Sequence, residues 1–343
     1  MFELALKHPL QRCWLAVLCV SACLIHVGAV TAEESASPHS LTAILSGEIP
    51  ANATDLRAMQ EHVQSLTPQL VAATVAVRVG HAHGSGVVIS GDGYVLTAAH
   101  VAGQPNQAAR ITLSDGRQLT GTTLGVYRTL DAGLIRIPAN PAGDPWPHAK
   151  MGKSEDVSPG QWCLATGHPG GFQSGRQPVV RLGRILSLKE DATVHTDCTL
   201  IGGDSGGPLF DMQGQVIGVH SRIGGPLNVN LHVPVNTYSQ QWDRLTRGDS
   251  WGHVPGTQPY IGVYGEPMSD VARISEVPAG TPADKAGLRS GDIVIQFAGK
   301  PVSNFDSLKS CVEDEQPGNR VNIEVLRNGQ RELLQLVIGD NRD

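Results

Sequence analysis

Short apolar runs rich in β-branched residues, each ended by a glycine-containing turn, recur along most of this 343-residue chain. The stretch from Thr74 to Val79 alternates like a half-buried strand, and the segments 86–90 and 94–97 read as a hairpin around Gly91-Asp92-Gly93. The 40 Gly and 22 Pro favour many short strands joined by tight turns. A second group of short strands spans about residues 160–236. Two such groups with hardly a helix predict two β-barrels.

The first 32 residues have the pattern of a targeting segment. Basic residues precede an apolar stretch from Cys13 to Val30, and Val30-Thr31-Ala32 offers a small-residue cleavage site. A cleaved signal peptide is the first interpretation. An uncleaved N-terminal anchor is an alternative, since about 18 apolar residues can span a membrane. A lipoprotein cleavage box ending at Cys23 is a third interpretation. All three predict an exported protein, either periplasmic or secreted.

The remaining chain divides into three parts. Residues 33–65 read as a linker and a short helix, which begins near Thr54 and should end at Pro68. Residues 66–246 hold both groups of strands, and 247–256 reads as an interdomain linker before a small α+β domain at 257–340. The formal net charge of −6 has no long run of one sign, which argues against a nucleic-acid surface.

The most informative string is Gly202-Gly203-Asp204-Ser205-Gly206-Gly207-Pro208-Leu209. Acyl transfer needs an exposed nucleophile and backbone N–H groups aimed at the developing oxyanion. We therefore expect Ser205 to be the nucleophile, with the N–H groups of Gly203 and Ser205 as oxyanion donors. The string also satisfies G-x-S-x-G, but a nucleophile elbow leads into a helix. Here Pro208 is followed by strand-like residues, and the best histidine lies upstream.

That histidine is His100, which follows a strand and the small residues Ala98 and Ala99. Asp131 enters the apolar segment 132–135, where a carboxylate is costly unless a partner satisfies it. A histidine Nδ1–H is such a partner, and the carboxylate stabilises the imidazolium that forms during attack. The sequence thus predicts His100 as base and Asp131 as the group that orients it.

The order His, Asp, Ser resembles that of the chymotrypsin-like serine proteases. Their bacterial HtrA (Deg) branch is similar in its local strings, which here are Gly84-Ser85-Gly86-Val87-Val88, Thr97-Ala98-Ala99-His100, Leu130-Asp131-Ala132-Gly133-Leu134 and the Ser205 string. The resemblance covers about residues 56–339. It implies two six-stranded barrels with the triad in the cleft between them, and a homotrimer. Asp204 is a departure, because HtrA proteins usually carry Asn before the nucleophile.

Residues 257–340 resemble a PDZ domain, on the strings Ala283-Asp284-Lys285-Ala286-Gly287-Leu288 and Ser290-Gly291-Asp292-Ile293-Val294. The resemblance places a carboxylate-binding loop at Tyr260-Ile261-Gly262-Val263, which we also expect to be a strand. A peptide C-terminus would add beside it as a further strand. A helix over 305–312, with Leu308 inward, would form the other wall. A packing domain that binds nothing is the alternative.

Other polar residues yield weaker expectations. Thr199 lies six residues before Ser205, where proteases with a basic preference carry an acid, so we expect a preference for small or medium apolar side chains. His220, Ser221 and Arg222 should form the edge that binds the substrate backbone, with His232 narrowing the pocket. No metal or cofactor is expected, since His81 and His83 lack a third ligand. Cys163 and Cys198 could pair, or could be small buried residues.

These features predict an exported serine endopeptidase that cleaves unfolded or damaged proteins and binds peptide C-termini through its second domain. The alternative is an inactive protease-like scaffold that holds peptides without cleaving them. A complete triad and its surrounding glycines favour the enzyme, because a binding protein has no chemical need for all of them.

Overall fold

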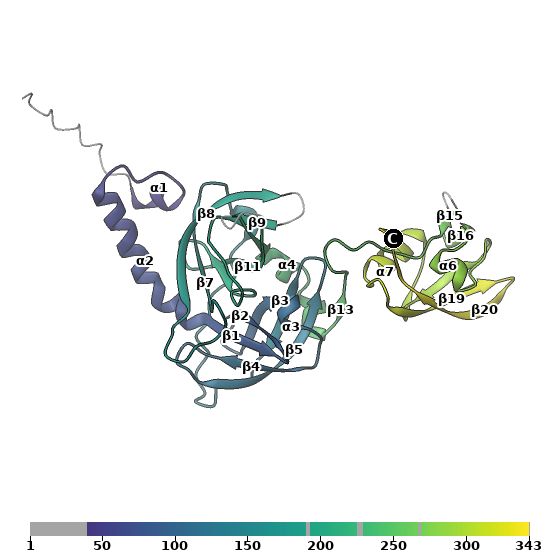
Figure 1. Cartoon of the computed structure of the whole chain (residues 1–343), viewed down its shortest axis with the longest axis horizontal. Coiled ribbons are helices and arrows are strands. Elements are labelled where there is room, and N and C mark those ends of the chain that lie inside the picture. The colour runs from purple at the N-terminus through teal and green to yellow at the C-terminus, as the bar shows by residue number, and fades with distance from the viewer. Residues whose placement is uncertain (1–39, 190–192, 225–228, 267–268, 343) are drawn as a thin grey trace, which may run out of the picture. The chain divides into compact units, whose positions relative to one another are not determined.

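The structure is a computed structural model that describes residues 40–189, 193–224, 229–266 and 269–342 (Figure 1). The targeting segment expected at 1–32 lies outside the described residues. None of the described helices is both long enough and apolar enough to cross a membrane.

Two helices precede the first strand. Helix α1 (Leu41–Leu45) is capped by the Ser40 hydroxyl, and α2 (Ala53–Ala73) begins after Asn52, whose side-chain oxygen accepts two N–H groups. We expected the second helix to end at Pro68, but it continues to Ala73. Pro68 removes one helical hydrogen bond. The last turn buries Leu70 and Ala73 completely, and this tertiary packing offsets the loss.

The first barrel consists of six antiparallel strands. They are β1 (Thr74–Val79), β2 (Ala82–Val88), β3 (Tyr94–Ala98), β4 (Ala108–Thr112), β5 (Gln118–Tyr127) and β6 (Ala132–Arg136). Their order is β5-β4-β1-β2-β3-β6, and pairing of β5 with β6 closes the barrel. Val75, Val77, Val95, Ile111 and Ile135 fill its interior. Helix α3 (Ala99–Ala102) follows β3 directly, which places one helical turn at the end of a barrel strand.

The second barrel is closed in the order β10-β11-β12-β9-β8-β7. A 3₁₀ turn, η1 (Ser154–Asp156), precedes it. Its strands are β7 (Trp162–Gly167), β8 (Val179–Lys189), β9 (Thr193–Thr196), β10 (Pro208–Phe210), β11 (Val216–Ile223) and β12 (Asn230–Pro234). Helices α4 (Val235–Gln240) and α5 (Trp242–Arg247) follow. The expected double β-barrel is thereby confirmed, and Figure 1 shows both barrels as a strand-rich body with few helices.

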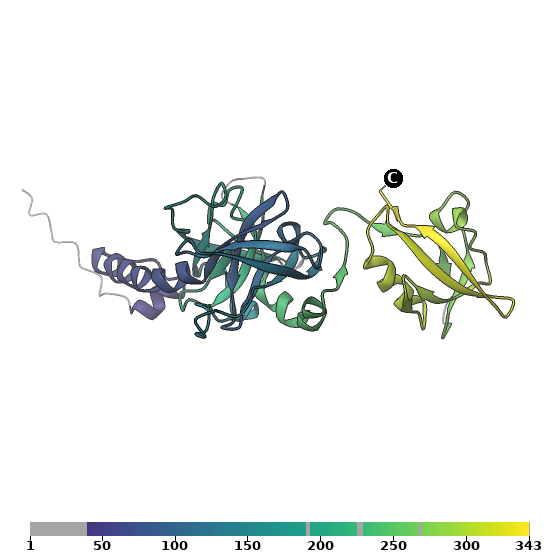
Figure 2. The ribbon, with the colours of Figure 1, turned by 90° about the horizontal axis from the view of Figure 1, so that it is seen from below.

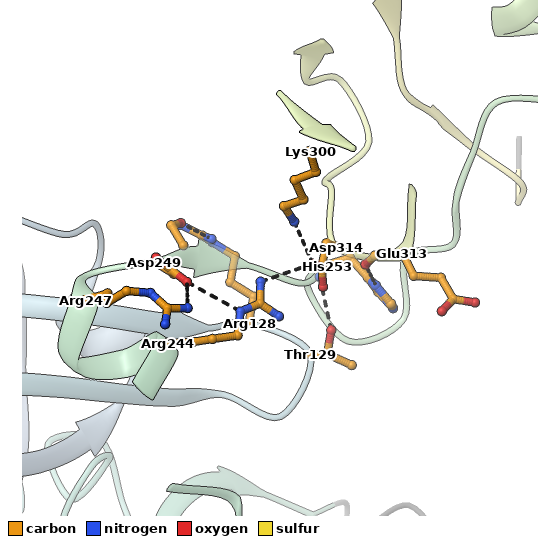
Figure 3. Close-up of polar contacts among 10 residues, drawn as sticks. Arg128, Thr129, Arg244, Arg247, Asp249, His253, Lys300, Glu313 and Asp314 are labelled. Atoms are coloured by element: carbon orange, nitrogen blue, oxygen red, sulfur yellow. Dashed lines mark hydrogen bonds and ion pairs between the residues drawn. The ribbon is translucent and has the colours of Figure 1, made fainter. Parts of the chain in front are cut away.

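The segment after α5 is only partly a linker. Ser250–Trp251 forms β13, which pairs in parallel with β5, and Trp251 is buried against the ring of Tyr127 at a centroid distance of 4.9 Å. Figure 3 shows Arg244 and Arg247 converging on Asp249, at 3.6 and 3.0 Å. The first residues of the expected linker thus pack on the first barrel, because burial of an aromatic side chain stabilises this segment there.

The C-terminal domain is a small α+β unit. A two-stranded sheet pairs β14 (Pro259–Tyr260) with β21 (Gly339–Asp340). The larger sheet has the order β15-β16-β17-β19-β20, with β18 on β17. These strands are β15 (Tyr264–Gly265), β16 (Ala272–Glu276), β17 (Ile293–Phe297), β18 (Lys300–Pro301), β19 (Arg320–Arg327) and β20 (Gln330–Val337). Figure 2 shows the long β19–β20 hairpin at the yellow end of the colour range.

Two helices accompany this sheet. Helix α6 (Pro282–Lys285) is capped by Thr281, and α7 (Phe305–Glu313) has a capping box between Asn304 and Ser307. The expected strand at 260–263 is regular only at Tyr260. Gly262 has a φ of +75°, which takes the next residues out of an extended ladder.

Candidate active site

His100 and Asp131 meet at one end of the first barrel. His100 lies in α3, directly after β3, and Asp131 lies in the turn between β5 and β6 with a φ of +59°. A non-glycine residue in this region is strained, although aspartate tolerates it better than most. The imidazole Nδ1 is 2.9 Å from Asp131 Oδ2, and the backbone N–H of His100 donates to Oδ1 at 3.0 Å. The turn thus directs the Asp131 carboxylate at both the imidazole ring and the backbone N–H of His100.

A third donor completes the surroundings of this carboxylate. The Ser221 hydroxyl donates to Asp131 Oδ2 at 2.6 Å, from β11 of the second barrel. Asp131 therefore accepts hydrogen bonds from both barrels. Its hydrogen bond to the ring raises the pKa of His100 above the usual value, while burial and Arg222 act in the opposite direction.

Ser205 lies in the loop between β9 and β10, where glycines let it approach the first barrel. Gly206 has a φ of +85°, and a Cβ there would overlap Thr97 Oγ1 at the end of β3. The Ser205 carbonyl accepts the N–H of Ser85 at 2.7 Å. The loop that carries Ser205 is therefore packed against β2 and β3, and β3 leads to His100. Within the described residues, no hydrogen bond joins Ser205 Oγ to His100, and such contacts often tighten only when substrate binds.

The two expected oxyanion donors are available. Among the described residues, the N–H groups of Gly203 and Ser205 donate to no protein acceptor. The Gly203 carbonyl does not compete for these N–H groups, since it accepts a hydrogen bond from the Ser85 hydroxyl at 2.8 Å. Gly202 is fixed in the same way, because its carbonyl accepts the N–H of Gly170 at 2.6 Å. This arrangement leaves two neighbouring N–H groups free to bind an oxyanion.

Asp204 is fully buried beneath this loop. Arg181 on β8 reaches it with N–O distances of 3.1 and 3.3 Å, and the N–H of Ile201 donates to its second oxygen at 3.0 Å. Burial raises the pKa of Asp204, and Arg181 partly offsets that effect. Sequence reasoning missed Arg181. The available signal was a carboxylate in an apolar, glycine-rich loop, which requires a cation somewhere in the fold.

The expected substrate-binding residues have different environments. His220 is completely buried: its ring contacts the carbonyl of Thr166 at 3.1 Å and the ring of His232 at 2.9 Å. Its backbone groups pair with Gly206 and Gly207 at 2.7 Å each, so it supports the loop that carries Ser205. Burial lowers the pKa of His220 to about 3, so its ring is neutral at physiological pH. Thr199 and Arg222 have exposed side chains.

The fold brings the two cysteines of the second barrel together. Cys163 and Cys198 are buried, with their sulfurs 3.7 Å apart and no disulfide between them. Neither thiol is exposed to a substrate. His81 lies in the turn before β2 and His83 near the start of that strand, and the described part of the chain holds no group of three potential metal ligands.

Comparison with known proteins fits this geometry. The model of the trypsin-like peptidase domain matches residues 84–219, and the PDZ domain model matches residues 259–338. The chain belongs to the HtrA-like serine proteases with a PDZ domain.

Curated relatives of this HtrA-like chain carry the name probable periplasmic serine endoprotease DegP-like. The protein from Halomonas elongata is 31% identical over 271 residues, which cover 75% of this chain and 56% of the relative. That from a Marinomonas species is 33% identical over 274 residues, which cover 74% and 56%. The HtrA-like chain thus spans about half the length of the curated relatives it matches. The solved serine endoprotease from Yersinia pestis shares its fold, with a TM-score of 0.50, 24% identity, and coverage of 85% and 99%.

The PDZ domain of the HtrA-like chain contains a groove of about 470 Å³. The segment Tyr260 to Tyr264 forms one wall, and α7 forms the other with Phe305, Leu308 and Val312. Among the described residues, the N–H groups of Gly262 and Val263 have no protein acceptor. Gly262 has a positive φ, and a Cβ added there would lie 2.5 Å from Thr281 Cβ, so this loop requires a glycine. The groove thus combines free backbone donors on one wall with apolar side chains on the other.

Proposed function

We propose that this protein is an exported serine endopeptidase that cleaves unfolded or damaged proteins through an acyl-enzyme on Ser205. His100 acts as general base and then as general acid, and Asp131 fixes its orientation. The observation that carries the proposal is the Asp131 carboxylate, which bonds the His100 ring at 2.9 Å beside a loop with two unpaired N–H groups. This combination suits attack on a carbonyl and stabilisation of the oxyanion.

The proposed order of events follows from these contacts. Ser205 Oγ attacks the scissile carbonyl and transfers its proton to His100 Nε2, while the carbonyl oxygen moves toward the N–H groups of Gly203 and Ser205. The imidazolium then protonates the leaving amine. Water repeats the sequence on the acyl-enzyme and regenerates Ser205. Asp131 accepts hydrogen bonds from His100 and Ser221 at once, which keeps the ring in one orientation.

The PDZ groove supports a second activity, which is the binding of peptide C-termini. A terminal carboxylate fits the N–H groups of Gly262 and Val263, and an apolar last side chain fits against Leu308 and Val312 on the wall formed by α7. The relatives named as periplasmic support an exported location. Assembly into a homotrimer is a further expectation, which sedimentation of the purified protein tests.

The decisive experiment uses a fluorophosphonate probe and unfolded casein. The wild-type protein should be labelled at Ser205 and should release casein fragments, whereas Ser205→Ala should do neither. Casein that stays soluble without fragments, together with an unlabelled Ser205, would show a holding scaffold instead of a protease.

A further inference from the structure

A cavity of about 350 Å³ lies on the outer face of the first barrel, beside the loop that follows β7. Arg78 of β1, His83 of β2 and His81 in the turn between these strands line one side, and Arg110 on β4 extends it. Gly170 and Phe172 of the loop close the other side. Its lining contains no acidic residue.

The strand register places the basic side chains in one row. Arg78 is the direct partner of Arg110 in the β1–β4 ladder and of His83 in the β1–β2 ladder. Directly paired residues point to the same face of a sheet, and like charges in that arrangement are destabilising. Within the described residues, neither arginine forms an ion pair, and Arg78 donates from Nε only to the Gly80 carbonyl at 3.3 Å. The two guanidinium groups thus retain most of their donors for an anion.

Both walls of the cavity contact the proposed nucleophile loop. On one side, Ser85 lies two residues after His83 on β2 and donates its N–H to the Ser205 carbonyl at 2.7 Å. On the other, the N–H of Gly170 donates to the Gly202 carbonyl at 2.6 Å. Arg176 holds the loop in place by donating to the carbonyls of Pro169 and Gly171. The cavity therefore adjoins the reaction centre.

The direction in which a substrate peptide would cross Ser205 follows from β11, which lies on the side of the loop opposite the cavity. Under the proposed function, the acyl part of the substrate pairs with the edge of β11 near Ser221 and Arg222. That edge joins the nucleophile loop at Gly206, whose N–H donates to the His220 carbonyl at 2.7 Å. A substrate peptide that starts at β11 and continues past Ser205 therefore runs toward β2 and the loop at 170–172. The basic cavity thus lies on the side from which the leaving group departs.

We propose that this cavity is a specificity subsite for a carboxylate side chain shortly after the scissile bond. An extended peptide advances about 3.3 Å per residue, so the second or third residue after that bond reaches the cavity. Arg78 and Arg110 would bind the carboxylate of an Asp or Glu at that position, with His83 at the rim. The inference rests on the proposed endopeptidase function and adds to it a preference for the residues that follow the scissile bond.

The test uses fluorogenic peptides that extend on both sides of one cleavage site. They differ only in carrying Glu, Gln or Lys at the second and third positions after that site. The full-length protein should cleave the Glu peptide with a kcat/KM about five- to tenfold above that of the Lys peptide, since exposed ion pairs give modest gains. Salt at about 0.5 M should reduce the ratio, because the groups are exposed.

Variants assign the preference to these side chains. In Arg78→Gln/Arg110→Gln the Glu-to-Lys ratio should fall to within about twofold of unity, and Arg110→Glu should shift it toward Lys. Arg57→Gln, at an exposed arginine of α2, is the matched control and should keep the wild-type ratio. The thermal midpoint of each variant verifies folding.

The outcomes separate the two proposals. Absence of fluorophosphonate labelling and of all cleavage contradicts the proposed function itself. Labelling and cleavage with equal rates for the Glu and Lys peptides overturns the subsite alone. A Glu preference that persists unchanged in the folded double variant or in Arg110→Glu also overturns it, since the arginines would then not be its cause. Inhibition of all peptides alike by inorganic phosphate, without a Glu preference, would indicate a free-anion site instead.

Discussion

The guanidinium of Arg181 lies 3.1 Å from the carboxylate of Asp204, the residue that directly precedes the proposed nucleophile. The pair joins β8 to the loop that carries both expected oxyanion donors. The contact thus lies inside the second barrel, and its cationic partner comes from a residue 23 positions earlier in the chain. Because the loop has four glycines around Ser205, this ion pair is one of few side-chain anchors that fix its conformation.

Arg181→Gln should therefore impair turnover more than binding. Removal of the cation leaves a buried carboxylate unpaired, which typically costs about 3 kcal/mol of stability. We expect kcat to fall by about 10²-fold through misplacement of the oxyanion donors, with a smaller change in KM. Steady-state kinetics and urea unfolding measure the two effects. Arg181→Gln/Asp204→Asn should recover part of both, and equal loss in the single and double variants would contradict the pairing argument.

Ser205→Ala should abolish peptide-bond cleavage and leave the fold intact. Loss of a triad nucleophile typically lowers turnover by about a million-fold. The side chain makes no hydrogen bond to His100 in this structure, so its removal disturbs no described contact of the dyad. Casein digestion and the thermal midpoint check the two halves of the prediction. Substantial cleavage by the pure, folded variant would rule out Ser205.

Asp131→Asn should lower kcat by about 10⁴-fold. An amide in place of the carboxylate no longer stabilises the imidazolium, and it can present an N–H to a ring nitrogen that also carries a proton. Ser221→Ala removes only the third donor and should have a much smaller effect, which makes it the matched control. A rate for Asp131→Asn within about tenfold of the wild type would contradict the proposed role.

Activity should fall as the pH drops through the pKa of His100. The neutral ring is the base, and the Asp131 hydrogen bond raises that pKa above 6.5. The decline in kcat/KM should therefore begin above pH 6.5 and continue below it. The pKa values of about 4 for His168 and about 3 for His220 place their titration outside this window. A flat profile between pH 5 and 8 in the folded protein would exclude a histidine base.

The protein should prefer small or medium apolar side chains at the residue before the scissile bond. The reason is that Thr199 is exposed and carries no charge to bind Lys or Arg. A peptide library with varied residues before the scissile bond measures this. A profile dominated by Lys or Arg refutes the prediction. Thr199→Asp should shift the profile toward basic residues if this side chain lines the pocket.

The PDZ groove should bind peptides with a free apolar C-terminus at least about tenfold more tightly than their C-terminal amides. Gly262→Ala should weaken binding, because its φ is +75° and the new Cβ would lie 2.5 Å from Thr281 Cβ. Gly299→Ala is the control, since Gly299 has a φ of +79° but no neighbouring atom within 4 Å of the Cβ position. Fluorescence anisotropy with labelled peptides measures both. Equal affinity for acid and amide would contradict a carboxylate loop.

The sequence alone determined the class of fold. Alternation of β-branched residues is a local property, and it predicted β1 at Thr74–Val79 with the observed bounds. The Asn328-Gly329 turn, with φ of +50° and +80°, is equally local and joins β19 to β20. His100, Asp131 and Ser205 could be named because each lies in a short string whose chemistry is unusual for an ordinary strand or turn.

Only the tertiary structure decided how distant residues meet. The ion pair of Arg181 with Asp204, the hydroxyl of Ser221 on Asp131, and the row of Arg78 with Arg110 all depend on strand register and barrel closure. The helix past Pro68 and the buried Trp251 likewise depend on packing that overrides local signals. The reason is physical: strand and turn preferences act between neighbours in the chain, whereas burial and charge pairing act between neighbours in space.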